Sequence, residues 1–127
     1  MKSFAYLALA ALALATPVSA DDAAKLNITL ANFSFTPSAI KLKAGQPVTL
    51  HFDNRGSGGH DFTAPEFFKA ATMNSATRAR LGSKGRVELG AGTSADVVLT
   101  PKAGTYTVKC GHFLHAGFGM TGTITVS

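Results

Sequence analysis

The sequence predicts an all-β fold, a Greek-key β-sandwich with a short helical excursion around residues 65–80. Several short segments alternate apolar and polar residues with a period of two, which is typical of half-buried antiparallel strands. Turns that contain glycine or proline separate these segments, as in a sandwich of two sheets. A single stretch in the middle of the chain instead carries the signals of a helix start.

The predicted strands follow one another along the chain; residues 97–99 are a short apolar run, and the others place their apolar residues on one face. They lie near residues 26–30, 40–43, 48–53, 87–89, 97–99, 106–109 and 123–126. We expect the inward faces to form the core, together with the aromatic residues Phe33, Phe35, Phe52 and Phe62.

The helical excursion begins at the sequence Thr63-Ala64-Pro65-Glu66, a capping-box pattern with proline at the first helical position. It predicts a short helix over about residues 65–73, followed by a small, polar and basic stretch. The cations of that stretch form either a solvated loop or a docking surface for an acidic partner, which would act on association rate and orientation. They are Arg78, Arg80, Lys84 and Arg86.

The first twenty residues are predicted to be a signal peptide. Lys2 precedes an apolar run, and small residues end it before a cleavage site between Ala20 and Asp21. The run is shorter than the about 20 apolar residues that span a bilayer, although a retained anchor is the alternative. Residues 21–127 are then one exported, periplasmic domain without a membrane segment.

The net charge and the cysteine content limit the classes of function that the chain can have. The formal net charge is +5 before Lys2 is removed, but nucleic-acid binding is not expected of an exported chain with mostly scattered cations. Cys110 is the single cysteine and cannot form an internal disulfide. It is therefore a buried inert residue, an intermolecular crosslink or a metal ligand.

The neighbours of Cys110 favour the metal ligand. His115 and Met120 follow it at equal spacing, in the pattern Cys-x4-His-x4-Met between two predicted strands. Thiolate, thioether and imidazole together favour copper, and two imidazoles with one thiolate and a weak axial Met form a blue-copper site. His60, after a strand and the Gly58-Gly59 turn, is the candidate for the second imidazole.

These residues resemble the cupredoxins, the plastocyanin and azurin family. Residues 106–126 resemble the family's ligand loop, and residues 48–62 resemble the strand and loop that carry its first His. The resemblance implies a cupredoxin-like sandwich with one Cu(I)/Cu(II) ion per chain in a type 1 copper site. It carries His60, Cys110, His115 and Met120 over as the metal ligands.

The same resemblance implies electron transport to a redox partner protein, such as a cytochrome or a copper enzyme, and no enzymatic activity. The protein is expected to be a monomer. Some of the apolar residues around His115 are expected to be exposed where partners dock; these are Phe113, Leu114, Ala116 and Phe118.

Two residues depart from the family pattern. His112 could replace His115, bind copper transiently, lie on the surface or support the ligands from behind. His115 is favoured as the ligand because a single residue between Cys110 and His112 leaves little backbone for the turn. Asp61 stands where many cupredoxins have Asn. It could accept hydrogen bonds from the ligand loop and lower the reduction potential, or simply point to solvent.

Other functions stay open. The main alternative is a periplasmic copper tolerance, storage or delivery protein on the same fold. A zinc site of Cys and two His is chemically allowed, although Met120 counts against it, and a metal-free sandwich with a buried Cys110 is possible. A multicopper oxidase is excluded because four histidines cannot supply a trinuclear centre.

Overall fold

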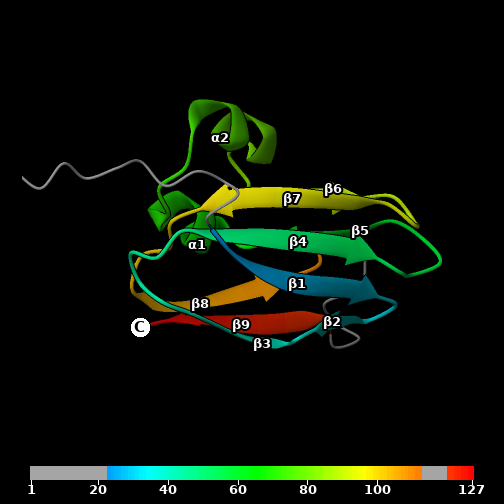
Figure 1. Cartoon of the computed structure of the whole chain (residues 1–127). Helices are drawn as coiled ribbons and strands as arrows, with labels where there is room; N and C mark the ends of the chain where they lie inside the picture. Colours follow the sequence, from blue (N-terminus) through cyan, green and yellow to red (C-terminus); the bar gives the residue numbers. More distant parts are fainter. Residues whose placement is uncertain (1–22, 113–119) are drawn as a thin grey trace, which may run out of the picture.

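The computed structural model describes residues 23–112 and 120–127, which fold into a sandwich of two β-sheets (Figure 1). One sheet has the strand order β2-β1-β4-β7 and the other β3-β9-β8-β5-β6. The strands are β1 (Ala24–Ala31), β2 (Ser34–Thr36), β3 (Ala39–Leu42), β4 (Val48–Asn54), β5 (His60–Thr63), β6 (Arg86–Leu89), β7 (Ser94–Leu99), β8 (Gly104–Lys109) and β9 (Thr121–Val126). The predicted all-β sandwich is confirmed.

Every strand predicted from alternation is present, whereas β2 and β5 were not predicted. All four residues of β5 are buried, so side chains on both of its faces are shielded from solvent, and the strand lies between β8 and β6 in its sheet. A strand that is buried on both faces shows no period of two, so its sequence carries no alternation signal.

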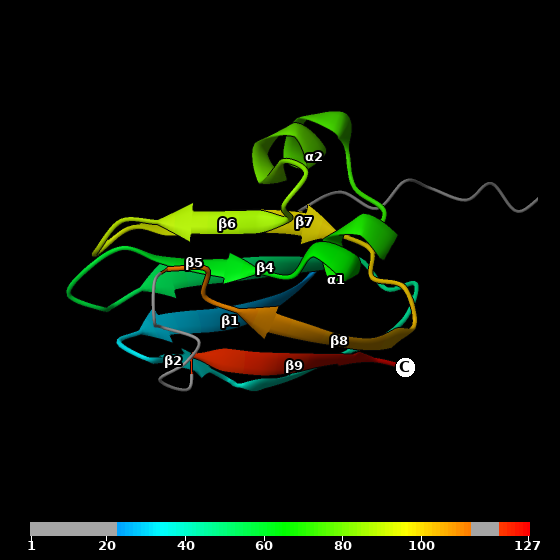
Figure 2. The same ribbon diagram turned by 180° about the vertical axis from the view of Figure 1, so that it is seen from behind.

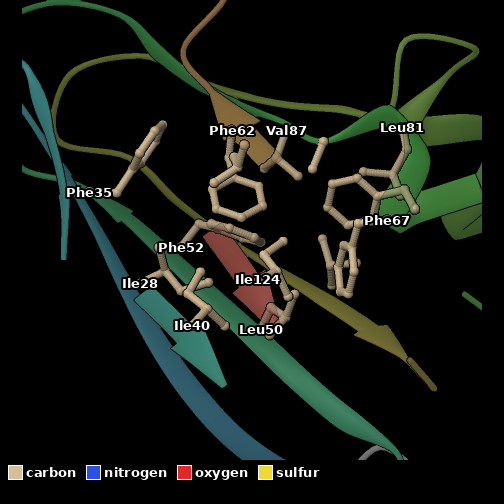
Figure 3. Close-up of a cluster of buried hydrophobic side chains, with 14 of the residues drawn as sticks. Ile28, Phe35, Ile40, Leu50, Phe52, Phe62, Phe67, Leu81, Val87 and Ile124 are labelled. Carbon is tan, nitrogen blue, oxygen red and sulfur yellow. The ribbon is translucent and has the colours of Figure 1, made fainter. Parts of the chain in front are cut away.

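The core lies between the sheets and is rich in aromatic side chains (Figure 3). The Phe62 ring is fully buried and lies 4.8 Å from the Phe52 ring centroid and 5.5 Å from that of Phe35. The prediction that Phe33 belongs to the core is wrong, because its side chain is 49% exposed at the turn between β1 and β2.

Two short helices, α1 (Pro65–Ala70) and α2 (Ser75–Leu81), replace the single predicted helix. The chain leaves α1 early because Ala71 is extended and Thr72 exchanges backbone hydrogen bonds with Thr100 at 2.8 and 2.9 Å. The predicted capping box is absent, since α1 has no side-chain cap and Thr63 belongs to β5. Asn74 caps α2 instead, and its side chain accepts a hydrogen bond from Thr77 N at 2.8 Å.

The basic residues after α1 are largely engaged with the protein. Arg78 donates to the carbonyls of Phe68 and Ala71 at 2.8 and 2.6 Å, which fastens α2 to the end of α1. Arg86 lies on β6 and donates to Thr63 Oγ1 at 3.2 Å. A freely solvated loop therefore does not describe this stretch.

The fold gathers distant segments at one end. The β1–β2 turn, the β4–β5 loop and the end of β8 lie at the end of the sandwich opposite the C-terminus (Figures 1 and 2). No helix within the described residues is long and apolar enough to cross a membrane.

Candidate metal centre

Strand register brings the two sulfur-bearing candidates together. The β8–β9 ladder pairs Lys109 with Thr121, and one position further Cys110 N donates to Met120 O at 3.1 Å. Cys110 and Met120 are 1% and 0% exposed. A thiol and a thioether therefore lie side by side, screened from water, at the mouth of the ligand loop.

The first residue of β5 brings an imidazole to the same place. His60 is buried, and its Nδ1 lies 4.0 Å from Cys110 Sγ. The backbone N–H of Asp61, the next residue, lies 3.5 Å from the same sulfur and donates to it. A single metal ion with bonds of about 2.0–2.3 Å, the lengths found for zinc with nitrogen and sulfur, can contact both donors.

These donors fit a soft metal ion. The structure brings His60, Cys110 and Met120 to one end of the sandwich, and the mixture of imidazole, thiolate and thioether is the one that copper prefers. His115, the fourth predicted ligand, lies outside the described residues, as do Phe113, Leu114, Ala116 and Phe118. Within residues 23–112 and 120–127, no three His, Cys, Asp or Glu side chains form a metal cluster.

Asp61 ties the strand of His60 to the loop that follows Cys110. Its carboxylate is fully buried, and Oδ1 accepts hydrogen bonds from Gly111 N at 2.7 Å and from the Thr63 hydroxyl at 2.6 Å. The prediction that Asp61 accepts from the ligand loop is confirmed, and the solvent-pointing alternative is wrong. Its other oxygen, Oδ2, has no hydrogen-bond partner among the described residues.

The charges around Asp61 compensate its burial. Arg86 Nε lies 3.9 Å and His112 Nε2 lies 3.5 Å from Oδ2. The half-buried His112 imidazole is also 3.2 Å from Glu88 Oε1, and its ring centroid is 6.3 Å from that of His60. His112 therefore faces carboxylates in this structure. His51, in contrast, lies on β4 and pairs with Asp96 on the neighbouring strand.

The pKa of the Cys110 thiol is raised, and the largest cause is its burial away from water. The backbone N–H groups of Asp61 and His112 act in the opposite direction and lower it, while the Asp61 carboxylate raises it and Arg86 lowers it. The raised pKa favours the protonated thiol near neutral pH, so a metal ion that binds Cys110 as a thiolate would displace its proton.

Comparison with known protein families shows to which family the chain belongs. The profile of the cupredoxin-like domain matches residues 4–126. The chain belongs to the cupredoxin-like family. A search of curated proteins found no match.

Solved structures share the cupredoxin-like fold. A dithionite-reduced auracyanin from Roseiflexus castenholzii is 19% identical over 83% of this chain and 98% of that chain, with a TM-score of 0.61. Auracyanin A, described as a "blue" copper protein from Chloroflexus aurantiacus, is 21% identical over 81% and 99%, with a TM-score of 0.54. The multicopper oxidase McoA from Aquifex aeolicus is 15% identical over 91% of this chain but only 32% of its own, with a TM-score of 0.64.

The role of two asparagines that contact the candidate site or the loop before it was not predicted from the sequence. Asn54 is fully buried at the end of β4, where its amide donates to the carbonyls of Gly58 and Leu89 and its Oδ1 accepts from Gly56 N. It thereby shapes the glycine-rich loop before His60. Asn32, on the β1–β2 turn, contacts His60 itself at 3.1 Å. An Asn that ends an alternating strand is the one signal that could have indicated such a role.

Proposed function

We propose that this protein transfers single electrons through a mononuclear copper site held by His60, Cys110, His115 and Met120. The observation that carries the proposal is the 4.0 Å approach of His60 Nδ1 to Cys110 Sγ in a buried setting beside Met120. Copper bound there would supply a reversible Cu(I)/Cu(II) couple. No substrate is transformed, so the proposed role is not enzymatic.

The protein's part is to hold the donors still while the charge of the site changes. His60 is fixed at the start of a buried strand, and Cys110 is fixed by its backbone bond to Met120. The bond from Gly111 N to Asp61 couples these two segments. A rigid donor set reduces the rearrangement that accompanies electron transfer, because interiors of native density resist displacement.

The proposal includes export and a partner. Residues 1–20 would act as a signal peptide and residues 21–127 as a periplasmic domain that exchanges electrons with a cytochrome or a copper enzyme. The description of auracyanin A as a "blue" copper protein supports the redox role. A protease-protection assay on intact and osmotically shocked cells tests the location.

The deciding experiment is the optical spectrum of the copper-loaded mature protein. An intense visible thiolate-to-copper(II) band that disappears reversibly on one-electron reduction is expected. A folded, copper-loaded sample without such a band would overturn the proposed site.

Replacement of His115 separates the two candidate histidines of the loop. His115→Ala is expected to abolish the band and lower copper affinity more than the about 10–100-fold typical of residues that only support a ligand. His112→Ala, the matched control, is expected to keep the band, since His112 faces Glu88 and Asp61. The reverse result, measured by copper titration, would make His112 the ligand.

Asp61→Asn is expected to raise the reduction potential by on the order of 50 mV, because a buried negative charge near the site favours Cu(II) and about 59 mV corresponds to a tenfold change for one electron. Asn keeps an oxygen that can accept from Gly111 N, while its neutral amide nitrogen takes the place of Oδ2 beside Arg86 and His112. Glu88→Gln is the control: its side chain is 57% exposed, and solvent screens exposed charges. An unchanged potential in Asp61→Asn, measured by voltammetry, would refute the charge effect.

Copper tolerance or delivery is the second candidate function. The observation that favours it is the His112 imidazole, whose ring centroid lies 6.3 Å from that of His60. Together with Glu88, 3.2 Å from His112 Nε2, it offers additional metal donors. A deletion strain that is copper-sensitive but respires normally would support this role. Rapid electron exchange of the purified protein with a cytochrome would support electron transfer.

A further inference from the structure

The β1–β2 turn holds an unusual backbone conformation beside the proposed site. Ala31 pairs with Ser34 across the hairpin, so Asn32 and Phe33 form the two-residue turn. Phe33 has φ 64, a left-handed conformation that costs a bulky non-glycine residue about 1–3 kcal/mol. Such strain persists only where surrounding contacts impose it. Asn32, the other residue of the turn, makes such contacts.

The Asn32 side chain reaches Ser57 in the β4–β5 loop and His60, the first residue of β5. Its Oδ1 lies 3.1 Å from His60 Nε2 and accepts a hydrogen bond from Ser57 N at 3.1 Å. Its amide nitrogen donates to Ser57 Oγ at 3.1 Å. Because Ser57 N can only donate, the atom that faces both it and His60 is the amide oxygen. These contacts join the first hairpin of the fold to the residue that begins β5.

The amide oxygen determines which nitrogen of His60 carries the proton. A carbonyl oxygen only accepts, so Nε2 must be the protonated nitrogen when it bonds to Asn32. In a neutral imidazole, Nδ1 is then unprotonated, and this is the atom 4.0 Å from Cys110 Sγ. Asn32 thus presents the lone pair of His60 to the thiol side of the site.

The contact depends on a residue without a side chain at position 56. A Cβ added to Gly56 would lie 2.5 Å from His60 Nε2 and 2.8 Å from Asn32 Oδ1. Real Cβ atoms do not approach so closely, so the loop or one of these two side chains would have to shift. The loop therefore accommodates the pair of Asn32 and His60 only because Gly56 leaves room for it.

We propose that Asn32 is a positioning residue for the metal centre, which fixes the ring orientation and the Nε2–H tautomer of His60. Partners of this kind hold a ligating imidazole in place and increase its basicity. The part of the proposal that concerns copper rests on the proposed function, whereas the tautomer of His60 belongs to the protein without metal.

The test begins with the metal-free protein. Long-range ¹H–¹⁵N correlation spectra of the His60 imidazole, recorded above its titration range, report which nitrogen is protonated. The wild-type protein is expected to show Nε2–H alone. Asn32→Leu, which keeps the approximate size but lacks the acceptor, is expected to show a mixture of both tautomers. An unchanged Nε2–H signal in Asn32→Leu would overturn the proposal.

Copper titration provides the second readout. Asn32→Leu is expected to lower copper affinity by about 10-fold or more, within the range for residues that orient a ligand. Asn32→Asp keeps the accepting oxygen and is expected to retain the tautomer. Ser57→Ala removes the hydroxyl contact to Asn32 but leaves the backbone donor, so it is expected to resemble the wild-type protein; an equal loss of affinity in this variant would assign the effect to loop order and overturn the proposal.

Gly56→Ala is an independent variant that keeps asparagine at position 32. Its added methyl group is expected to displace the His60 ring and produce the same tautomer mixture and a comparable loss of affinity; wild-type behaviour would contradict the geometry. The two proposals fail differently. A wild-type protein that lacks the thiolate–copper band refutes the proposed function, whereas the tautomer shift in Asn32→Leu tests the role of Asn32 by itself.

Discussion

Copper-loaded Cys110→Ser is expected to lack the intense visible band of the wild-type protein completely. The band requires a thiolate bonded to copper(II), and Cys110 is the chain's single cysteine. A serine hydroxyl is a hard donor that stays protonated near neutral pH, and soft thiolate ligands are the ones that select copper. Cys110 is buried against the Asp61 N–H group, and serine changes the side-chain volume little because it differs only by oxygen in place of sulfur. The absorption spectrum at matched copper occupancy measures the effect.

The same substitution is expected to remove most of the stability that copper adds. A ligand that binds only the folded state at 100 times its dissociation constant adds about 2.7 kcal/mol. Thermal unfolding with and without copper should therefore show a large shift for the wild-type protein and a small one for Cys110→Ser. Met120→Leu is the matched control, since it conserves volume and removes only the weak axial donor. A band that survives in Cys110→Ser would show that another group produces it.

The sequence predicted most strands correctly because they bury only one of their two faces, so apolar and polar residues alternate along them. Alternation located β4 and β9, whose residues point alternately to the core and to solvent. It could not locate β5, whose four residues are all buried. It also placed Phe33 in the core, although tertiary structure puts this residue on an exposed turn. The hydrophobic pattern predicts which strand residues are buried. It does not predict which apolar side chains are exposed because they lie in a turn.

The part of the candidate site that could be predicted is the part whose residues lie close together in the sequence or follow the family pattern. Cys110 and Met120 flank one hairpin connection, so strand pairing alone brings them together. The link between Asp61 and Gly111 could be anticipated from the family resemblance. The contact between Asn32 and His60 could not, because it joins segments 28 residues apart through a turn whose geometry no local pattern specifies.

Phe62→Ala is expected to lower the free energy of unfolding of the metal-free protein by about 3–5 kcal/mol. The Phe62 side chain is fully buried at the centre of the aromatic core (Figure 3). Its ring lies 4.8 Å from Phe52, 5.5 Å from Phe35 and 6.1 Å from Phe68. Its removal leaves a cavity among these rings, because the surroundings of a truncated core residue relax only partially. Such a loss is a large part of the about 5–15 kcal/mol that stabilises a typical protein.

Urea unfolding measures this loss, and Phe62→Leu separates its two parts. Leucine retains most of the apolar volume but loses the ring contacts, which contribute about 0.5–1.5 kcal/mol per pair beyond buried area. Its cost should therefore lie between those of the wild-type protein and Phe62→Ala. Equal stability of Phe62→Ala and the wild-type protein would contradict the described packing. Phe62 and His60 lie two residues apart on β5, so their side chains point to the same face of the sheet. The packing of Phe62 in the core therefore also holds the strand that places His60 beside Cys110.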